Sequence, residues 1–430
     1  MEILLNLSIS LLVGLILSRV AKLLKLPAVT AYLVAGILVS PYLLGAFGIE
    51  GLGFVSLENV KQYSLLSDVA LGFIAFSIGN EFRLAQLKEI GKQATVIGIL
   101  QALITTVAVD AALIGLHFIL GDKFPLSAAI VLGAVATATA PAATLLVVRQ
   151  YLAKGPLSDI LLPVVALDDA VGLVVFAASF GVARAIEKGD VEIWKIILEP
   201  IIEVVFSIIL GFIMGLLFTL CERFFHSRSK RLAVSVTFVL LTVALSKVEF
   251  EAFGLHFAFS SLLVCMMLGS VFCNACDFSE ELMDRVDRWT APLFILFFVL
   301  SGAELELSVF TDLAIVLIGV VYILFRSLGK YSGAYISARA MKCDSNITRY
   351  LGITLLPQAG VALGMAIKAA ELGTSGHIVA NITLFAVLIY ELIGPMLTKI
   401  ALTKSGDIVP DGKTSARGTI GDEKGAANQK

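Results

Sequence analysis

Long apolar runs, separated by short polar segments, follow one another along the sequence to about residue 400. A helix needs about 20 predominantly apolar residues to cross the hydrocarbon core of a bilayer. Charged and turn-forming residues divide the apolar sequence into thirteen stretches of this kind, and we predict a helix in each. The predicted helices cover residues 3–21, 28–46, 64–80, 93–120, 126–149, 158–184, 197–221, 232–247, 254–272, 289–304, 311–338, 350–370 and 376–399.

The composition supports an all-α polytopic membrane protein and excludes several other classes. Of the 430 residues, 58% are hydrophobic and 15% are charged, whereas soluble domains average about 45–50% and about 25%. Such a chain cannot cover its surface with polar groups in water, so a soluble enzyme, a nucleic-acid-binding protein and a disordered scaffold are excluded. The formal net charge of -2 indicates no acidic or basic partner. The expected surroundings are a lipid bilayer.

Lysines and arginines predict the orientation of the chain, because short loops rich in these residues stay in the cytoplasm. Loop 1 is the segment between the first and second predicted helices, and the later loops are numbered in order. Most of the lysines and arginines lie in the odd-numbered loops or after the last predicted helix. We therefore expect a multi-pass protein of a prokaryotic inner (plasma) membrane, with its N-terminus outside and its C-terminus in the cytoplasm. Residues 401–430 are rich in glycine and have little apolar surface to dock, which predicts a disordered cytoplasmic tail.

Charged residues inside the predicted helices are the first functional candidates, because a charge near the bilayer centre costs about 2.5–3.5 kcal/mol on insertion scales. Asp168 and Asp169 are adjacent near the middle of the sixth predicted helix. Neighbouring side chains on a helix point in different directions, so one aspartate can pair with a cationic side chain while the other holds a proton or a cation. Carboxylate oxygens of this kind suit Na⁺ or Li⁺ in competition with H⁺. A buried ion-pair cluster that only fixes helix packing is the alternative.

Two cationic residues and two further acids lie in other predicted helices. Arg326 and Lys330 are four residues apart, and therefore on one face of the eleventh predicted helix. We expect them to compensate buried negative charge. Asp110 and Glu391 interrupt the fourth and thirteenth predicted helices and are candidates for a proton pathway. Arg326 is expected either to pair with one of these acids or to extend to the membrane interface.

Proline interrupts two of the predicted helices at mid-membrane depth. A proline frees a backbone carbonyl and favours local unwinding. Two interrupted helices in corresponding halves of a membrane protein indicate a binding site at the midplane, whereas two ordinary proline kinks are the alternative. The residues concerned are Thr137, Thr139 and Pro141 in the fifth predicted helix, and Pro357 and Gln358 in the twelfth.

The two halves of the chain repeat the same order of helices. Helices four to six and eleven to thirteen each consist of a charged helix, a proline-interrupted helix and an acidic helix. The sets are offset by an odd number of helices, so the second crosses the membrane in the opposite direction to the first. Such inverted repeats are typical of secondary transporters. No GxxxxGK[ST] phosphate-binding pattern occurs in the sequence, so an ATP-driven pump is not expected.

The motifs resemble those of monovalent cation:proton antiporter family 2, the sodium/proton exchanger group. The resemblance covers about residues 10 to 400 and includes TATAP at 137–141, LDDA at 167–170 and LPQAGVALGMA at 356–366. It implies that Asp169 binds the cation or proton, that its companion Asp168 pairs with Lys330, and that the unwound segment lends oxygens from Thr139 and Thr137. Some relatives have an acid between the threonine and proline of this turn, where this chain has Ala140.

The resemblance also implies an architecture. Two inverted repeats would cross at their discontinuous helices within a membrane transporter domain at residues 1–400, and the protein would be a homodimer. The expected parts are core helices at about 93–184 and 311–399, scaffold and dimer helices at about 3–80 and 232–304, a linker helix at about 197–221, and the tail at 401–430.

The expected function is exchange of cytoplasmic Na⁺ (or Li⁺) for external H⁺ by alternating access, without a cofactor or enzymatic step. Two titrating acids favour more than one proton per cation, and hence electrogenic exchange. A K⁺/H⁺ or mixed Na⁺/K⁺:H⁺ antiporter on the same fold is the nearest alternative. A non-transporting ion or germinant sensor is an alternative from another class, and the intact set of Asp168, Asp169 and Lys330 argues against it. An intramembrane aspartyl protease is disfavoured, because it needs its two aspartates on different helices.

Overall fold

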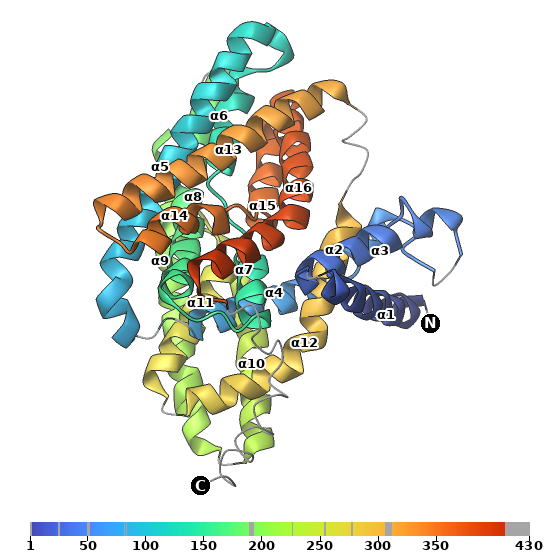
Figure 1. Cartoon of the computed structure of the whole chain (residues 1–430), viewed down its shortest axis with the longest axis vertical. Coiled ribbons are helices and arrows are strands. Elements are labelled where there is room, and N and C mark those ends of the chain that lie inside the picture. The colour runs from blue at the N-terminus through green and yellow to red at the C-terminus, as the bar shows by residue number, and fades with distance from the viewer. Residues whose placement is uncertain are drawn as a thin grey trace.

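The computed structural model is almost entirely helical (Figure 1). It describes residues 2–24, 26–49, 52–80, 82, 84–188, 193–225, 227–252, 255–276, 278–305 and 312–408. Within these ranges, nine helical segments are long and apolar enough to cross a membrane, and one of them, Ala28–Phe47, combines an α-helix with a short 3-10 helix. Three shorter apolar helices cover Ser64–Asn80, Leu126–Val135 and Ser261–Ala275.

The helices follow the predicted apolar stretches closely. They are α1 (Glu2–Leu23), α2 (Ala28–Val39), α3 (Leu57–Lys61), α4 (Ser64–Asn80), α5 (Leu84–Leu120), α6 (Leu126–Val135), α7 (Pro141–Gln150), α8 (Pro156–Lys188), α9 (Ile193–Phe224), α10 (Arg228–Ser246), α11 (Ser261–Ala275), α12 (Ser279–Glu304), α13 (Leu313–Ala340), α14 (Ser345–Thr354), α15 (Gly360–Ala369) and α16 (Thr374–Ser405). Short 3-10 helices cover Leu44–Phe47, Gly121–Lys123 and Ala370–Leu372.

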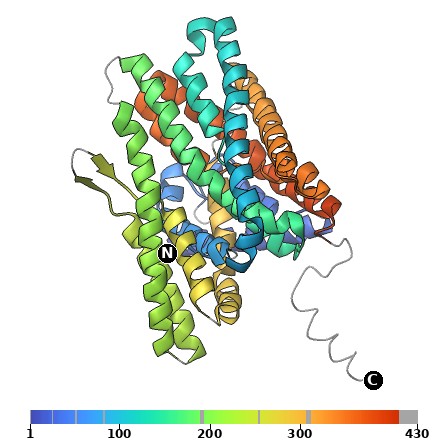
Figure 2. The ribbon, with the colours of Figure 1, turned by 90° about the vertical axis from the view of Figure 1, so that its left-hand side faces the viewer.

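Four predicted boundaries were wrong. The helices predicted to begin at 93 and 289 begin earlier, at Leu84 and Ser279. The other two differences have local reasons. The helix predicted at 28–46 ends at Val39, because Ser40 precedes a proline and is extended, with ψ 163°. The helix predicted at 254–272 begins only at Ser261, and Ser260 provides its N-cap. The residues before it form an antiparallel hairpin of β1 (Phe250–Ala252) and β2 (Leu255–Phe257). This hairpin projects beside α9, as Figure 2 shows.

The two proline-interrupted helices are each broken into separate halves. The helix predicted at 126–149 consists of α6 and α7, and the helix predicted at 350–370 consists of α14 and α15. The breaks meet, because the backbone N–H of Ala140 donates a hydrogen bond to the carbonyl of Pro357 at 2.8 Å. Each break therefore satisfies part of the backbone that the other leaves without a helical partner.

The helices around the two breaks form one group. The most extensive helix pairing joins α13 to α5, and α8 packs on both α5 and α6 (Figures 1 and 2). Gly329 and Gly333 permit the close approach of α13, since a Cβ at either would lie within 3 Å of the Cα of Thr105 or Gln101 on α5. A second set of helices packs beside this group, with α12 against α2 and α11 against α4 and α9, and α9 also contacts α8.

The last described residues return to the beginning of α8. The Asp407 carboxylate accepts a hydrogen bond from the backbone N–H of Ser158 at 2.7 Å. The backbone carbonyl of Asp407 accepts another from the backbone N–H of Lys154 at 3.0 Å. Gly155 allows this approach, because a Cβ there would lie 2.7 Å from the Asp407 carboxyl carbon. Ile408 is buried. Residues 401–408, predicted as the start of a disordered tail, therefore continue α16 and dock; residues 409–430 lie outside the described residues.

Candidate functional site

Asp168 is held at the centre of a fully buried polar cluster. It lies on α8, where the Nζ of Lys330 from α13 donates to its Oδ2 at 2.5 Å, and both side chains have no exposed surface. Thr139, from the break between α6 and α7, donates its hydroxyl to the same oxygen at 2.5 Å. Gln101 on α5 donates its amide to the other carboxylate oxygen. Four elements therefore converge on one carboxylate.

Asp169 has the opposite environment, although it is the next residue. Its side chain is 2% exposed, and within the described residues neither carboxylate oxygen has a hydrogen-bond partner. An ionised carboxylate buried in this way is strongly unfavourable unless a proton or cation compensates it. Asp169 lines a cavity of about 580 Å³, whose wall also includes Gly360, Gly364 and Met365 on α15, the helix that follows the second break.

The cavity lined by Asp169 extends toward one end of the helices. Its wall includes Asp68 and Lys247, which form an ion pair at 2.9 Å, and further charged residues at Arg184 and Lys368. All four lie near even-numbered loops, which the distribution of lysines and arginines along the sequence predicts to be outside. The carboxylate that lacks a partner is therefore connected with the end of the molecule that this topology places outside.

Arg326 and Lys330 bind the carbonyls that the broken helices expose. The Arg326 guanidinium donates to the carbonyls of Ala136 at 3.0 Å, Ala138 at 2.6 Å and Leu356 at 2.7 Å. Lys330 also donates to the carbonyl of Thr137 at 2.5 Å. Carbonyls at a helix C-terminus carry partial negative charge, which these cations balance. In the described part of the chain, neither Asp110 nor Glu391 is a hydrogen-bond partner of Arg326, and the Arg326 side chain is fully buried. Both alternatives, pairing with one of these acids and extension to the membrane interface, were therefore wrong.

The other predicted residues of the breaks have mainly backbone roles. The Thr137 hydroxyl donates to the carbonyl of Ala134 at 2.7 Å, so its carbonyl rather than its side chain faces Lys330. Pro141 begins α7. The Gln358 amide donates to the carbonyl of Val135 at 3.0 Å and to the Tyr322 hydroxyl at 2.9 Å.

Two residues of the site were missed by sequence reasoning. Gln101 reaches Asp168, and the fully buried Tyr322 reaches Gln358. Both are polar side chains within apolar helices and on the same helices as Asp110 and Lys330. The signal that could have found them is therefore uncharged polarity in a membrane helix, whereas the prediction relied mainly on charged residues.

Asp110 and Glu391, the candidates for a proton pathway, do not line the cavity of Asp169. Asp110 on α5 packs against α6, where a Cβ at Gly133 would lie only 1.8 Å from its Oδ1. Glu391 on α16 is 6% exposed, and its Oε2 has no hydrogen-bond partner among the described residues. It lines a cavity of about 200 Å³ that also includes Glu304.

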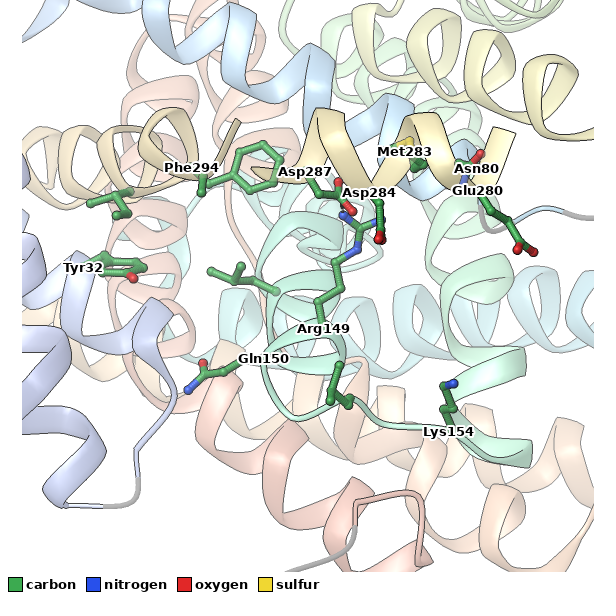
Figure 3. Close-up of a pocket in the computed structure, with 14 residues that line it drawn as sticks. Tyr32, Asn80, Arg149, Gln150, Lys154, Glu280, Met283, Asp284, Asp287 and Phe294 are labelled. Carbon is green, nitrogen blue, oxygen red and sulfur yellow. Dashed lines mark hydrogen bonds and ion pairs between the residues drawn. The ribbon is translucent and has the colours of Figure 1, made fainter. Parts of the chain in front are cut away.

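A third cavity, of about 900 Å³, opens near the opposite ends of the helices (Figure 3). Arg149 at the end of α7 extends toward Asp287 on α12, and their charged groups are 2.5 Å apart. The next residue, Gln150, accepts a hydrogen bond from the N–H of Ala28 at the start of α2 at 2.8 Å. Among the described residues that line this cavity, neither aspartate of the buried pair occurs. The end of α7 therefore joins two helices of the second set.

Residues 7–404 match the family model described as sodium/hydrogen exchanger, transmembrane. Two similar curated proteins are the Na(+)/H(+) antiporter NhaS4 of Synechocystis sp., 22% identical over 90% of this chain and 93% of the relative, and the K(+)/H(+) antiporter subunit KhtU of Bacillus subtilis, 23% identical over 89% and 90%. Among solved structures, the sodium proton antiporter MjNhaP1 from Methanocaldococcus jannaschii is similar with TM-scores of 0.67 and 0.74. The two comparisons give 17% and 16% identity, cover 94% and 95% of this chain, and cover 99% and 97% of the MjNhaP1 chain.

Proposed function

Because this chain belongs to the sodium/hydrogen exchanger family of membrane proteins, we propose that it exchanges cytoplasmic Na⁺ (or Li⁺) for external H⁺ by alternating access. One observation carries this proposal: Asp169 is a buried carboxylate without a hydrogen-bond partner among the described residues, and it lines a cavity beside the crossing of two broken helices. A proton or a monovalent cation can each compensate that charge, but their binding to the same oxygens is mutually exclusive. Competition at one carboxylate couples the two ions.

The Asp168–Lys330 pair supports transport of a second proton. Asp168 already accepts from Lys330, Thr139 and Gln101, so it needs no external cation in this conformation. We propose that Asp168 turns toward the cation as a further oxygen ligand when Na⁺ binds at Asp169, and that Lys330 then loses its counter-charge. A buried lysine without a counter-charge readily gives up its proton. The exchange is then electrogenic, with more than one proton for each cation.

The cavities support alternating access between two sides. The cavity of Asp169 extends toward the ends predicted to be outside. On the opposite side, the end of α7 is joined to α12 and α2 by Arg149 and Gln150. We assign this conformation to the outward-facing state of a homodimer in the inner (plasma) membrane, with its C-terminus in the cytoplasm. In the inward-facing state, the contacts of α7 break and the outer cavity closes.

The decisive experiment is Asp169→Asn in everted vesicles. The amide has nearly the same shape, but it can neither release a proton nor supply a negative charge to Na⁺. We expect cation-dependent proton movement to be abolished while the amount of protein in the membrane is unchanged. Asp159→Asn, which removes an exposed acid from the first turn of the same helix, is the matched control and should exchange normally. Exchange by the Asp169 variant at more than about a twentieth of the wild-type rate would overturn the proposal.

The similarity to KhtU favours a second candidate, a K⁺/H⁺ or mixed Na⁺/K⁺:H⁺ antiporter. Selectivity depends on the number and spacing of the oxygen ligands once the cation is bound. Titrating the wild-type protein with Na⁺, Li⁺ and K⁺ in the same vesicles distinguishes the candidates. Half-maximal exchange at a lower concentration of K⁺ than of Na⁺ would identify K⁺ as the substrate.

A further inference from the structure

At the helix crossing, the helix C-terminal ends have cationic partners, whereas the helix N-terminal ends have no polar capping side chains. The C-terminal ends of α6 and α14 receive the cations Arg326 and Lys330. The N-terminal ends of α7 and α15 meet at the same crossing, and a helix N-terminus carries partial positive charge. Such an end is usually capped by Ser, Thr, Asp or Asn. Here the N-cap of α7 is Ala140, which provides no side-chain cap, and α15 begins at Gly360 after an alanine.

Glu391 faces both of these uncapped helix starts. The cavity of about 200 Å³ that it lines is also bounded by residues 140–143 at the start of α7 and 359–361 at the start of α15. Close packing keeps this part of α16 against the crossing, because a Cβ at Gly394 would lie 3.0 Å from the Cα of Pro357. The Glu391 side chain is buried, and its Oε2 has no hydrogen-bond partner within the described ranges.

The cavity of Glu391 also adjoins that of Asp169. Leu71, Leu262, Gly360 and Val361 line both cavities, so these residues form the partition between them. A negative charge on one side of such an apolar partition acts on a cation at the other side with less screening than in water. The other acid in the Glu391 cavity, Glu304, lies at the exposed end of α12.

We propose that Glu391 is the anion that balances the positive N-terminal ends of α7 and α15, and so favours cation binding at Asp169 without contacting the cation. It is a positioning residue for the exchange reaction. This inference rests on the proposed function, because it assumes that the crossing is the transport site. Without this charge, the two positive helix ends act on the site uncompensated and oppose the entry of Na⁺.

The test is Glu391→Gln in proteoliposomes, with the Na⁺ concentration for half-maximal exchange as the readout. We expect that concentration to rise about tenfold, in line with a partly buried charge acting on helix ends, while the maximal rate and the melting temperature change little. Glu222→Gln is the matched control, because it removes another buried carboxylate, on α9, that bounds none of the three cavities described above. It should keep the wild-type half-maximal concentration.

A rescue experiment separates charge from packing. Ala140 lines the same cavity at the N-cap of α7, so Ala140→Asp places a new carboxylate at the same helix ends. In the Glu391→Gln background, we expect it to bring half-maximal exchange back to within about twofold of wild type. Glu391→Asp, which keeps the charge, should also remain near wild type.

Two results would overturn the inference while leaving the proposed function intact. In the first, Glu391→Gln exchanges with the wild-type Na⁺ dependence although Asp169→Asn is inactive. In the second, Ala140→Asp leaves the Glu391→Gln defect unchanged in a protein that melts normally. Active exchange by Asp169→Asn would instead reject the proposed function itself.

Discussion

The two adjacent aspartates differ in their surroundings, and we therefore assign them different roles. Asp168 accepts hydrogen bonds from three side chains, whereas Asp169 has no partner among the described residues. The side chains leave the helix in different directions, so Asp168 meets α5, α13 and the first break, while Asp169 meets a cavity. Under the proposed function, one acid is held by the protein and the other is left for the transported ion.

Replacing Lys330 tests whether the pair carries charge during transport. Lys330→Ala leaves Asp168 buried with only neutral partners, and breaking a buried pair in this way costs about 3–5 kcal/mol in soluble proteins. We expect a lower melting temperature in detergent, fewer protons per cation, and loss of the dependence on membrane potential in voltage-clamped proteoliposomes. Lys330→Arg should be intermediate, because a guanidinium keeps the pair but does not release its proton.

The control for this prediction is Lys247→Gln. Lys247 also forms an ion pair with an aspartate, but its side chain is 54% exposed, so its contribution should be small. Unchanged voltage dependence in Lys330→Ala would show that Lys330 serves packing alone.

Charges within apolar sequence made Asp168, Asp169, Arg326 and Lys330 recognisable from the sequence alone. Their partners were harder to predict. Arg326 binds three backbone carbonyls that become free only because two helices break, and the breaks meet only in the folded protein. Gln101 was missed because an amide side chain in an apolar helix does not by itself indicate a function. Its role is evident only in the folded protein, where it donates a hydrogen bond to Asp168.

At the scale of elements, the short helix α7 connects the site to the rest of the molecule. Its first residue, Pro141, follows the break that carries Thr139, and its last two residues bind α12 and α2. Movement of α7 would therefore change the site and both contacts together. Proline predicted the interruption, whereas the length of the unwound segment and the meeting of the two breaks depend on tertiary packing that hydropathy does not encode.

We predict that Asp287→Asn favours the inward-facing state. The Asp287 carboxylate binds Arg149 on α7 and Ser77 on α4, so the amide removes the ionic contact of α7 with α12 but preserves shape. In hydrogen-exchange mass spectrometry, peptides of α7 should exchange faster, and those around Gly364 in the outer cavity should exchange more slowly.

The matched control for Asp287 is Asp284→Asn. Asp284 lines the same cavity, but its ion pair with Arg288 lies within α12 and is exposed on both sides. This variant should exchange like wild type. If Asp287→Asn gave the same pattern as Asp284→Asn, the contact would not hold the outward-facing state.

At the scale of the whole molecule, membership of the sodium/hydrogen exchanger family and the all-helical antiporter fold were predicted from the sequence, and both are confirmed. Hydropathy sufficed because each membrane helix must satisfy its own backbone within its own segment. The hairpin of β1 and β2 was missed, since its short aromatic strands have no comparable signal. The docked end of the chain was also missed, because it depends on Asp407 and Ile408 contacting a distant helix.

Two truncations distinguish the docked residues from those that follow. Deleting residues 409–430 should leave exchange and melting temperature unchanged, because the contacts with α8 described above are made by Asp407 and stay in place. Deleting residues 405–430 also removes Asp407 and Ile408, and loss of a capping acid costs about 0.5–2 kcal/mol. We expect a lower melting temperature and slower exchange, and Asp407→Ala should reproduce most of the effect. Equal behaviour of the two truncated proteins would contradict this role.

The hydrogen bond between Ala140 and Pro357 has a consequence for biosynthesis. During synthesis, α6 and α7 enter the membrane long before the ribosome has made α13, α14 and α15. Until then, the carbonyls of Ala136 and Ala138 lack the guanidinium that binds them, and the N–H of Ala140 lacks its acceptor. Unsatisfied backbone is costly in lipid, so the nascent segment must remain a nearly continuous helix or stay in a polar environment. The break that contains Thr139 is therefore completed only as the second repeat inserts.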